Sequence, residues 1–433
     1  MFQSILFRAI CTGFLSGLYL VGQASGQTSD RNVVPMPDLP IAADMVEDPS
    51  TSIMSADPEA LDLYGSCIES YRHDGRTYLL IGQSRGVDVR VLEEDGSWDA
   101  HQFIEPPETC GNDGTFGTRF ALDGDRLFLR PTVLGDAARV HVFARDGERW
   151  AHAQDIGPAQ NNGEKLGLKV TAASGWLAVH GRGDVSLLRR DDEGRYVHAA
   201  TLTSPGVGDF DRQRFGKTVR IAGDHMAVSS FRAKGANECV DIYTMSDSGD
   251  WMHVQHLEPP HGLFGTWFGH HVRFGDGMMA ISSPRWRDNR GRVDVYHRGA
   301  GGGWEPRQVL DIFPDGLSSF GTRFRMAAGH LLVQSSTPRV PGSAYLFVLE
   351  DDGYRRVAMY GIKGREGASA SFGADALILP ELDSVAITAP GRAVAGLNRA
   401  GVVGMYPMPA VCGDGDDAGP ADEAGDAGTT STQ

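Results

Sequence analysis

Residues 268–310 read FGHHVRFGDGMMAISSPRWRDNRGRVDVYHRGAGGGWEPRQVL, and this stretch decides the fold. It contains four short apolar runs separated by turn residues. Gly275-Asp276-Gly277 supplies the left-handed dihedrals of a tight hairpin after the first run, and the glycines between 299 and 303 precede the last run. The stretch therefore predicts four antiparallel strands in about fifty residues, a sheet too small to be stable alone.

An aromatic-glycine pair opens this unit and recurs along the chain. The successive steps are 52, 50, 49, 53, 52 and 52 residues. The pairs begin at Tyr64, Phe116, Phe215, Phe268, Phe320 and Phe372, with Leu166-Gly167 as a degenerate copy. A near-constant period of this size with four strands per repeat is typical of propeller blades. The sequence therefore predicts an all-β fold, a seven-bladed β-propeller of four-stranded antiparallel blades.

The last blade lacks a strand of its own. The fourth strand of a blade opens on an aromatic residue only six times, at Trp98, Trp150, Tyr196, Trp251, Trp304 and Tyr354. The chain before the first blade can supply the missing strand, because Ile53-Met54 lies as far before Tyr64 as the fourth strands lie before the later anchors. We therefore expect residues 46–54 to close the ring as the outer strand of the seventh blade.

The repeat resembles the FG-GAP repeat of integrin-alpha-type β-propellers, in its secreted bacterial form. The resemblance rests on the order F-G-x-x-V, G-D, an apolar strand, V-x-V-Y and then Trp, over residues 46–408. The best GAP equivalents are residues 388–390 (Thr-Ala-Pro) and 282–284 (Ser-Ser-Pro), while Arg130-Pro131-Thr132 departs from the pattern. The resemblance implies an extracellular protein that binds a partner.

The ends of the chain differ from the repeats. Residues 1–26 hold Arg8 before an apolar run and small residues at its end, which predicts a cleaved signal peptide. Residues 27–45 carry prolines and read as a linker, and residues 409–433 are an acidic tail that we expect to be disordered. The protein is therefore expected to be secreted or periplasmic, in the cell envelope, without stable membrane insertion.

Charge and cysteines limit the partners. A net charge of −16 and a pI near 5.3 argue against nucleic acid or an anionic membrane surface. Removal of the signal segment leaves Cys67, Cys110, Cys239 and Cys412, and the first two lie near the inner ends of neighbouring blades. These two residues either form a Cys67–Cys110 disulfide or stay as free buried thiols. Tandem C-x-x-C spacing is absent, so structural zinc is not expected.

No cofactor is expected. Calcium needs six or more oxygen ligands and a loop of about nine to twelve residues, whereas the loops here shrink to Asp123-Gly124-Asp125 or Gly275-Asp276-Gly277. These residues are the ones that a tight hairpin requires. The histidines His152, His198 and His253 share one repeat position on an outer strand, which favours a structural role.

The candidate site lies on the innermost strands. Arg119, Lys217, Arg323 and the pair His270-His271 follow their aromatic-glycine anchors at similar distances, and we expect them to line the central channel with positive charge. The alternative is that they pair with acidic neighbours such as Asp375 or face water. The sequence contains no H-E-x-x-H and no phosphate-binding glycine loop.

The sequence favours a non-catalytic binding module that uses one propeller face to bind a protein or glycan partner. The alternative is an enzyme, a lyase or hydrolase acting on extracellular carbohydrate at the channel mouth, and a structural subunit of a surface assembly is a third reading. Exposed aromatics such as Phe264, Trp267 and Trp286 on a flat face would favour binding. A pocket with convergent ionisable side chains would favour catalysis.

Overall fold

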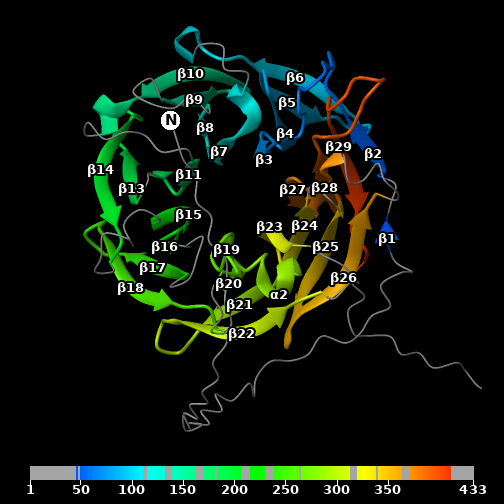
Figure 1. Ribbon diagram of the computed structural model, residues 1–433. Helices are drawn as coiled ribbons and strands as arrows, with labels where there is room; N and C mark the ends of the chain where they lie inside the picture. The colour runs from blue at the N-terminus through cyan, green and yellow to red at the C-terminus, as the bar shows by residue number, and fades with distance from the viewer. Residues whose placement is uncertain are drawn as a thin grey trace, which may run out of the picture.

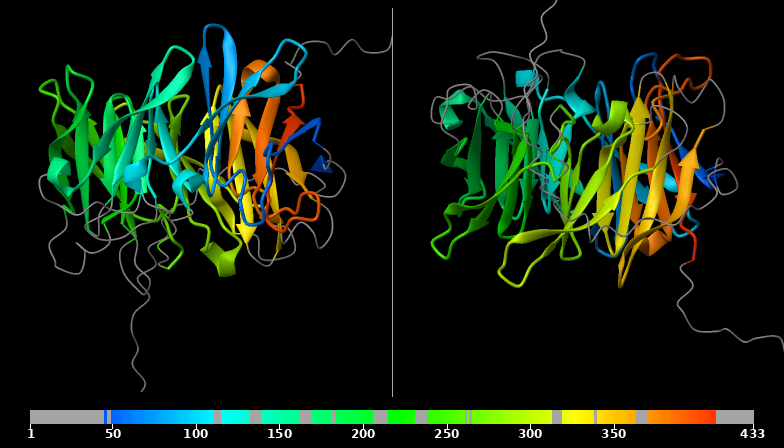
Figure 2. Two further views of the ribbon diagram at one scale, coloured as in Figure 1. Left: turned by 90° about the horizontal axis from the view of Figure 1, so that it is seen from above. Right: turned by 60° about the horizontal axis from the view of Figure 1, so that its bottom comes forward.

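The computed structural model of the chain is a ring of seven β-sheets around a central axis (Figure 1). It describes residues 45–46, 49–110, 115–131, 139–161, 169–180, 183–205, 215–230, 238–260, 262, 265–312, 319–337, 340–362 and 370–410. Seen from the side, the sheets stand next to one another in a thick disc (Figure 2). The predicted seven-bladed all-β propeller is confirmed.

Each blade contains four antiparallel strands, and in blades 1 to 5 the first of them along the chain lies nearest the axis (Figure 1). Blade 1 contains β3 (Ile68–His73), β4 (Arg76–Gln83), β5 (Gly86–Leu92) and β6 (Trp98–Ile104). Blade 2 contains β7 (Phe120–Asp123), β8 (Arg126–Leu129), β9 (Val140–Asp146) and β10 (Arg149–Ile156). Blade 3 contains β11 (Lys169–Ala173), β12 (Trp176–His180), β13 (Asp184–Arg190) and β14 (Tyr196–Thr203). Blades 4 and 5 are β15 (Phe215–Ala222), β16 (His225–Ser230), β17 (Cys239–Met245) and β18 (Trp251–Leu257); β19 (Val272–Gly275), β20 (Met278–Ser282), β21 (Val293–Arg298) and β22 (Trp304–Leu310).

Blades 6 and 7 contain the N-terminal strands. Blade 6 contains β23 (Phe320–Ala327), β24 (His330–Thr337), β25 (Val340–Glu350), β26 (Gly353–Gly361) and β1 (Met45–Val46). Blade 7 contains β27 (Ala376–Leu379), β28 (Ser384–Ala389), β29 (Val402–Pro407) and β2 (Thr51–Ile53). Short helical turns are η1 (Glu108–Cys110), η2 (Phe116–Thr118), η3 (Pro158–Asn161), α2 (Trp286–Asn289) and η4 (Pro380–Leu382). Among the described residues, no helix has the length and apolar character needed to cross a bilayer.

The predicted closure of the ring is confirmed. Strand β2 pairs antiparallel with β29, with Ser52 opposite Gly404, and it completes blade 7 as the outer strand. The sequence did not indicate that Met45–Val46 would pair in parallel with β26 and add a fifth strand to blade 6. The predicted signal peptide, most of the predicted linker and nearly all of the acidic tail lie outside the described residues.

The aromatic-glycine anchors are wedges between blades. We expected Phe268 to begin a strand, but β19 begins at Val272, and Phe268-Gly269 forms a turn in which Gly269 has φ +83°. Phe268 is fully buried and belongs to a cluster with Val240 and Leu257 of the preceding blade. The aromatic anchor of blade 5 therefore inserts its ring between this blade and the preceding one. The degenerate anchor Leu166-Gly167 lies outside the described residues.

A glutamine clamp also joins adjacent blades. The residue four after the aromatic of the fourth strand is Gln in several blades, and its amide pairs with the backbone of the corresponding aromatic in the next blade. Gln255 Nε2 donates to the Trp304 carbonyl at 2.9 Å, and the Trp304 N–H donates to Gln255 Oε1 at 2.8 Å. The other clamps join Gln102 to Trp150, Gln154 to Tyr196 and Gln308 to Tyr354. Each clamp satisfies two backbone groups at the outer rim.

Candidate functional site: a cationic cavity in the central channel

The inner ends of the blades surround a cavity of about 870 Å³, which we call the channel cavity. Its walls come from β3, β7, β11, β15, β19 and β23 and from the turns beside them, including the turn that precedes β27 (Figure 1). Such a volume is in the range of small-molecule sites in proteins.

Basic side chains dominate the lining. Eight arginines and lysines contribute to it, against two carboxylates, Glu69 and Asp375. The basic residues are Arg119, Arg130, Lys169, Arg220, Arg273, Arg323, Arg325 and Arg399. The chain as a whole carries a charge of −16, so the channel cavity concentrates positive charge inside an acidic protein.

The repeat fixes where these side chains point. The residue three positions after the anchor donates to a backbone carbonyl of the next blade in two blades. Lys169, which follows the degenerate anchor Leu166, places its Nζ 3.1 Å from the Lys217 carbonyl oxygen. Two positions further on, the pattern repeats, because Arg273 Nε donates to the Phe324 carbonyl at 3.3 Å. Thr218, at the third position after its anchor, also donates to a carbonyl of the next blade. Thr171 and Arg325, at the fifth position, do the same. These bonds tie the inner strands together and hold their charged ends at the channel wall.

An acidic corner neutralises one side of the cavity. Arg325 donates to Glu69 Oε1 at 2.9 Å and to Asp375 Oδ1 at 3.3 Å, and Arg323 Nη1 lies 3.6 Å from Asp375 Oδ2. Burial alone would lower the pKa of Arg325, but Glu69 and Asp375 hold it above its ordinary value. Burial likewise opposes ionisation of Asp375, yet Arg325 and Arg323 keep the pKa of this carboxyl below its usual value.

Two further cations of the lining, Lys169 and Arg220, are crowded by other cations. The Lys169 side chain is exposed at the channel but has protein atoms on most sides. Desolvation and the charges of Arg119, Arg220 and Arg323 lower its pKa to about 8. Burial and the charge of Arg325 lower the pKa of Arg220 to about 10. A cavity that lowers the pKa of its own cations stabilises an anion, because a bound negative charge relieves the repulsion.

Histidines of the wall are neutral at pH 7. Burial, Lys169 and Arg323 lower the pKa of His270 to about 4. Burial and the charges of Arg273 and Arg220 also lower the pKa of His271. Arg220 Nη2 lies 3.3 Å from His271 Nε2, and a guanidinium only donates, so the His271 proton is on Nδ1.

The turn before His270 is held rigidly. The buried carboxylate of Glu238 accepts hydrogen bonds from the backbone N–H groups of Thr266, Trp267 and Phe268, at 3.2, 2.9 and 3.1 Å. The indole ring of Trp267 stacks on the His270 imidazole, with centroids 5.4 Å apart. The preceding blade therefore fixes the position of this imidazole at the cavity wall.

The structure brings together four of the five predicted channel residues. Arg119, His270, His271 and Arg323 line the channel cavity, whereas the exposed Lys217 lies on β15 outside this lining and contributes its carbonyl group. Trp267 is half-buried beside His270, with Arg285 3.6 Å from its ring centre. Trp286 is only 5 % exposed, so it cannot belong to a flat aromatic face. Phe264 lies outside the described residues.

The two predicted disulfide partners belong to one hydrophobic cluster, in which Cys67 is buried and Cys110 is partly buried. Cys67 is buried and lines the channel cavity, and its thiol donates to the Phe120 carbonyl oxygen at 3.8 Å. Burial raises the pKa of Cys67 to about 12. Among the described residues the structure contains no Cys67–Cys110 bond, and that pairing stays a prediction for the oxidised protein.

Sequence reasoning missed much of the lining, namely Lys169, Arg220, Arg273 and Arg325. Arg220, Arg273 and Arg325 share the fifth position after their aromatic anchors, in three consecutive blades. That repetition was visible in the sequence. The expected channel residues occupy only the second and third positions after their anchors, although alternate residues of a strand share a side.

Comparisons with known proteins support the fold. No protein-family model matches the sequence, and no curated protein matches it either. A Lactobacillus plantarum protein of known structure is similar over 71% of this chain and 85% of its own, at 14% identity and a TM-score of 0.51. The Pseudomonas aeruginosa periplasmic gluconolactonase is similar over 72% and 89%, at 16% identity and a TM-score of 0.52. Identities this low show the fold alone.

These findings correct the expected function. The sequence favoured a non-catalytic binding module, yet convergent ionisable side chains line the channel cavity, and Trp286, expected on a flat aromatic face, is buried. The hydrolase alternative therefore fits better than the binding module. The resemblance to FG-GAP repeats has no matching family model and stays a prediction.

Proposed function

We propose that the protein is a hydrolase that opens a small lactone or ester bearing a carboxylate or phosphate, bound in the channel cavity. The observation that carries this proposal is the excess of basic side chains beside uncharged imidazoles. Guanidinium and ammonium groups bind carboxylates and phosphates. An imidazole that is neutral at pH 7 can accept a proton from water.

The residues divide the chemistry between them. Water attacks the carbonyl carbon while His270 accepts its proton, and Arg323, which is exposed to the channel, stabilises the oxyanion that forms. The bond from that carbon to the ring oxygen then breaks, and the Lys169 ammonium donates a proton to the leaving alkoxide. All three groups line the channel cavity, and the charges of Lys169 and Arg323 lower the pKa of His270.

Lactones are the first substrates to test. The Pseudomonas aeruginosa protein of similar fold is a gluconolactonase by name, but a shared propeller does not transfer an activity. The chemistry of the channel cavity favours a substrate with its own negative charge, because eight cations face it.

The test is a pH-stat assay at pH 7 with glucono-lactone, its phosphorylated form and a neutral aliphatic lactone. We expect the phosphorylated lactone to be hydrolysed with the highest kcat/KM. His270→Gln should lower kcat by roughly a hundredfold, the usual size of a general-base contribution. Arg323→Met should raise KM as well, because it also removes a charge that binds the anion.

The matched control is His101→Gln. His101 is on the outer strand β6 and bonds to the Glu148 carbonyl at 2.9 Å, away from the channel lining. This variant should keep the parent kcat and KM. If no lactone is hydrolysed faster than in buffer alone, or if His270→Gln retains the parent kcat, the proposed function fails.

A further inference from the structure

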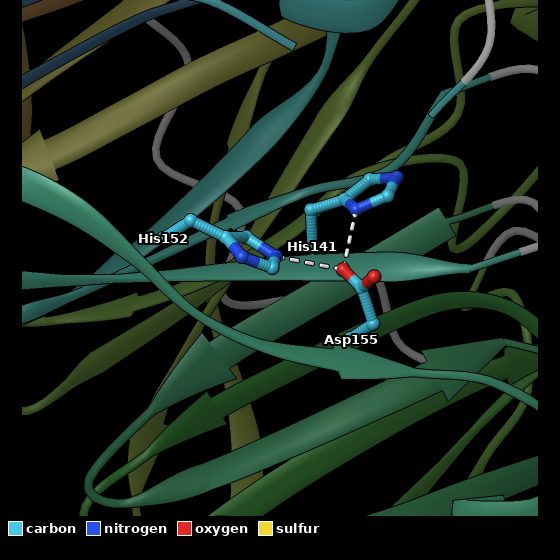
Figure 3. A group of neighbouring side chains, drawn as sticks. All are labelled: His141, His152 and Asp155. Carbon is cyan, nitrogen blue, oxygen red and sulfur yellow. Dashed lines mark hydrogen bonds and ion pairs between the residues drawn. The ribbon is translucent and has the colours of Figure 1, made fainter. Parts of the chain in front are cut away.

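Two outer-strand clusters combine histidines with a carboxylate at equivalent repeat positions. Blade 2 places His141, His152 and Asp155 together on β9 and β10 (Figure 3). Blade 4 places Asp241, His253 and His256 at the same three positions of β17 and β18. The aspartate is on the third strand in blade 4 and on the fourth strand in blade 2, and a histidine takes the other position in each blade.

Both clusters have the same bonding pattern. In blade 2, Asp155 Oδ1 lies 2.7 Å from His141 Nδ1 and 2.7 Å from His152 Nε2 (Figure 3). In blade 4, Asp241 Oδ1 lies 3.0 Å from His253 Nε2 and 2.8 Å from His256 Nδ1. One carboxylate oxygen therefore meets two imidazole nitrogens in each blade.

Blade 4 adds a fourth donor atom. The Cys239 thiol is two residues before Asp241 on β17, and its Sγ lies 4.0 Å from Asp241 Oδ2. The ligand atoms of Cys239, Asp241 and His256 all lie within 4.8 Å of one another. Thiolate, imidazole and carboxylate form a donor set that suits Zn²⁺.

Within the described residues, the ion-pair partners of Asp241 are imidazoles, which are cations only when protonated. Aspartates at the same position of the third strand are neutralised by arginine in blade 1, where Arg90 Nε lies 2.7 Å from Asp88, and in blade 5, where Arg292 Nε lies 2.7 Å from Asp294. In blade 4 the residue that corresponds to Arg292 is Cys239. The Asp241 side chain is only 2 % exposed, and its ion-pair partners within the described part of the chain are His253 and His256. A buried carboxylate normally has a paired cation.

We propose that Cys239, Asp241, His253 and His256 form a tetrahedral binding site for Zn²⁺ or a similar transition-metal dication. Bonds of about 2.0–2.3 Å to one ion separate the donor atoms by roughly 3.3–3.5 Å. The two imidazole nitrogens lie 2.8 and 3.0 Å from Asp241 Oδ1 and must move away from it by a few tenths of an ångström. The Cys239 sulfur must move inward, and His253, which lies outside the group of three ligand atoms within 4.8 Å of one another, needs the larger shift. Binding releases the Cys239 thiol proton, while each imidazole stays neutral with its hydrogen on the other ring nitrogen.

The cluster is also accessible. His253 and His256 are 34 % and 47 % exposed at their side chains, and the buried carboxylate and thiol lie beneath them. An ion can therefore enter from the solvent past the two imidazoles. The site is built on outer strands, separate from the channel cavity, so its test does not depend on the proposed hydrolase activity.

The experiment titrates the metal-stripped full-length protein with Co²⁺ and with Zn²⁺ alone. We expect one Co²⁺ per chain to produce a thiolate-to-cobalt charge-transfer band, which Zn²⁺ then displaces. Cys239→Ser should abolish this band and weaken Zn²⁺ binding at that site by more than about a hundredfold, since even outer-shell partners of metal ligands contribute 10–100-fold. Asp241→Asn and His256→Gln should weaken it too.

Two matched variants separate this site from other histidines. His198 holds the same position as His253 in blade 3 but bonds to Thr201 Oγ1, at 2.9 Å, and His152 belongs to the cluster of blade 2. His198→Gln and His152→Gln should both keep the charge-transfer band. Should a ligand variant not fold, the parent protein still decides, because Zn²⁺ must raise its Tm while Mg²⁺ does not. A cobalt spectrum without a thiolate band overturns the proposal.

Discussion

At the scale of single residues, Gly321 of the Phe320-Gly321 pair meets two demands. Gly321 has φ +86°, a conformation that residues with a side chain rarely adopt. A Cβ atom there would also lie 2.9 Å from Val293 Cγ2 and 3.0 Å from Ser282 Cβ, both in blade 5. The pair therefore works as a unit, in which the aromatic ring fills the space between blades and the glycine lets the backbones approach.

Gly321→Ala should destabilise the protein by about 2–4 kcal/mol, of which about 1–2 comes from the left-handed conformation and the rest from the clash. Gly277→Ala is the matched control, because Gly277 has φ +72° but a Cβ atom added there would meet no other atom within 4 Å. It should cost about 1–2 kcal/mol. Urea unfolding curves of both variants measure the difference, and equal midpoints would show that contact between blades does not require the glycine.

The anchors and the channel residues differ in how well the sequence predicts their roles. The period of the aromatic anchors predicted the number of blades because every copy must fill the same kind of space. The site was harder to predict, since Lys169 follows the degenerate anchor Leu166 and its lowered pKa depends on cations from other blades. The sequence of β11 alone cannot predict that Arg119, Arg220 and Arg323 of other blades lie near Lys169.

At the scale of elements, a β-bulge recurs between the third and fourth strands of blades 1 to 6. In blade 4 the register passes from Ile242–Gln255 to Tyr243–His253, so Val254 is left over. This extra residue brings His253 and His256 to one side of the sheet, although residues three apart on a regular strand face opposite sides. The alternation of a plain strand therefore could not predict the histidine clusters.

Strand β2 is the element that closes the ring. Ile53 is 4 % exposed and packs with Val403 and Met405, and β2 covers the outer edge of β29. Deletion of residues 46–54 should remove this packing and uncover an unpaired strand edge. The expected result is a Tm lower by at least roughly 5 °C, because the buried isoleucine alone contributes about 2 kcal/mol.

The control for this deletion is a protein that lacks only residues 1–44. It retains both N-terminal strands and should melt at the temperature of the full chain. Differential scanning calorimetry measures both. If the deletion of 46–54 leaves Tm unchanged, the ring does not depend on closure by β2.

At the scale of the whole molecule, the propeller separates charge by radius. The repeat places arginines and lysines of the inner strands around one axis, whereas the chain as a whole carries −16. Seven sheets that converge on an axis bring together residues about fifty positions apart, so single cations in successive repeats add to one field. Such a field attracts small anions to the axis and depends on ionic strength.

The pH dependence of anion binding tests this field. Lys169 has a pKa lowered to about 8, below its ordinary value of 10.5, so the lysine is charged below pH 8 and loses its charge as the pH rises through that value. A bound anion favours the charged form. The affinity for a phosphorylated sugar acid, whose phosphate is already a dianion above pH 7, should therefore fall between pH 7 and pH 9.5. The loss should be roughly five- to tenfold, as expected for one charge at close range. Isothermal titration calorimetry at constant ionic strength measures this loss of affinity.

The Lys169→Met variant should bind the anion more weakly at pH 7 and show almost no further loss of affinity up to pH 9.5. If that variant keeps the full pH dependence of the parent, another group titrates, and Lys169 does not contribute its charge to the bound anion.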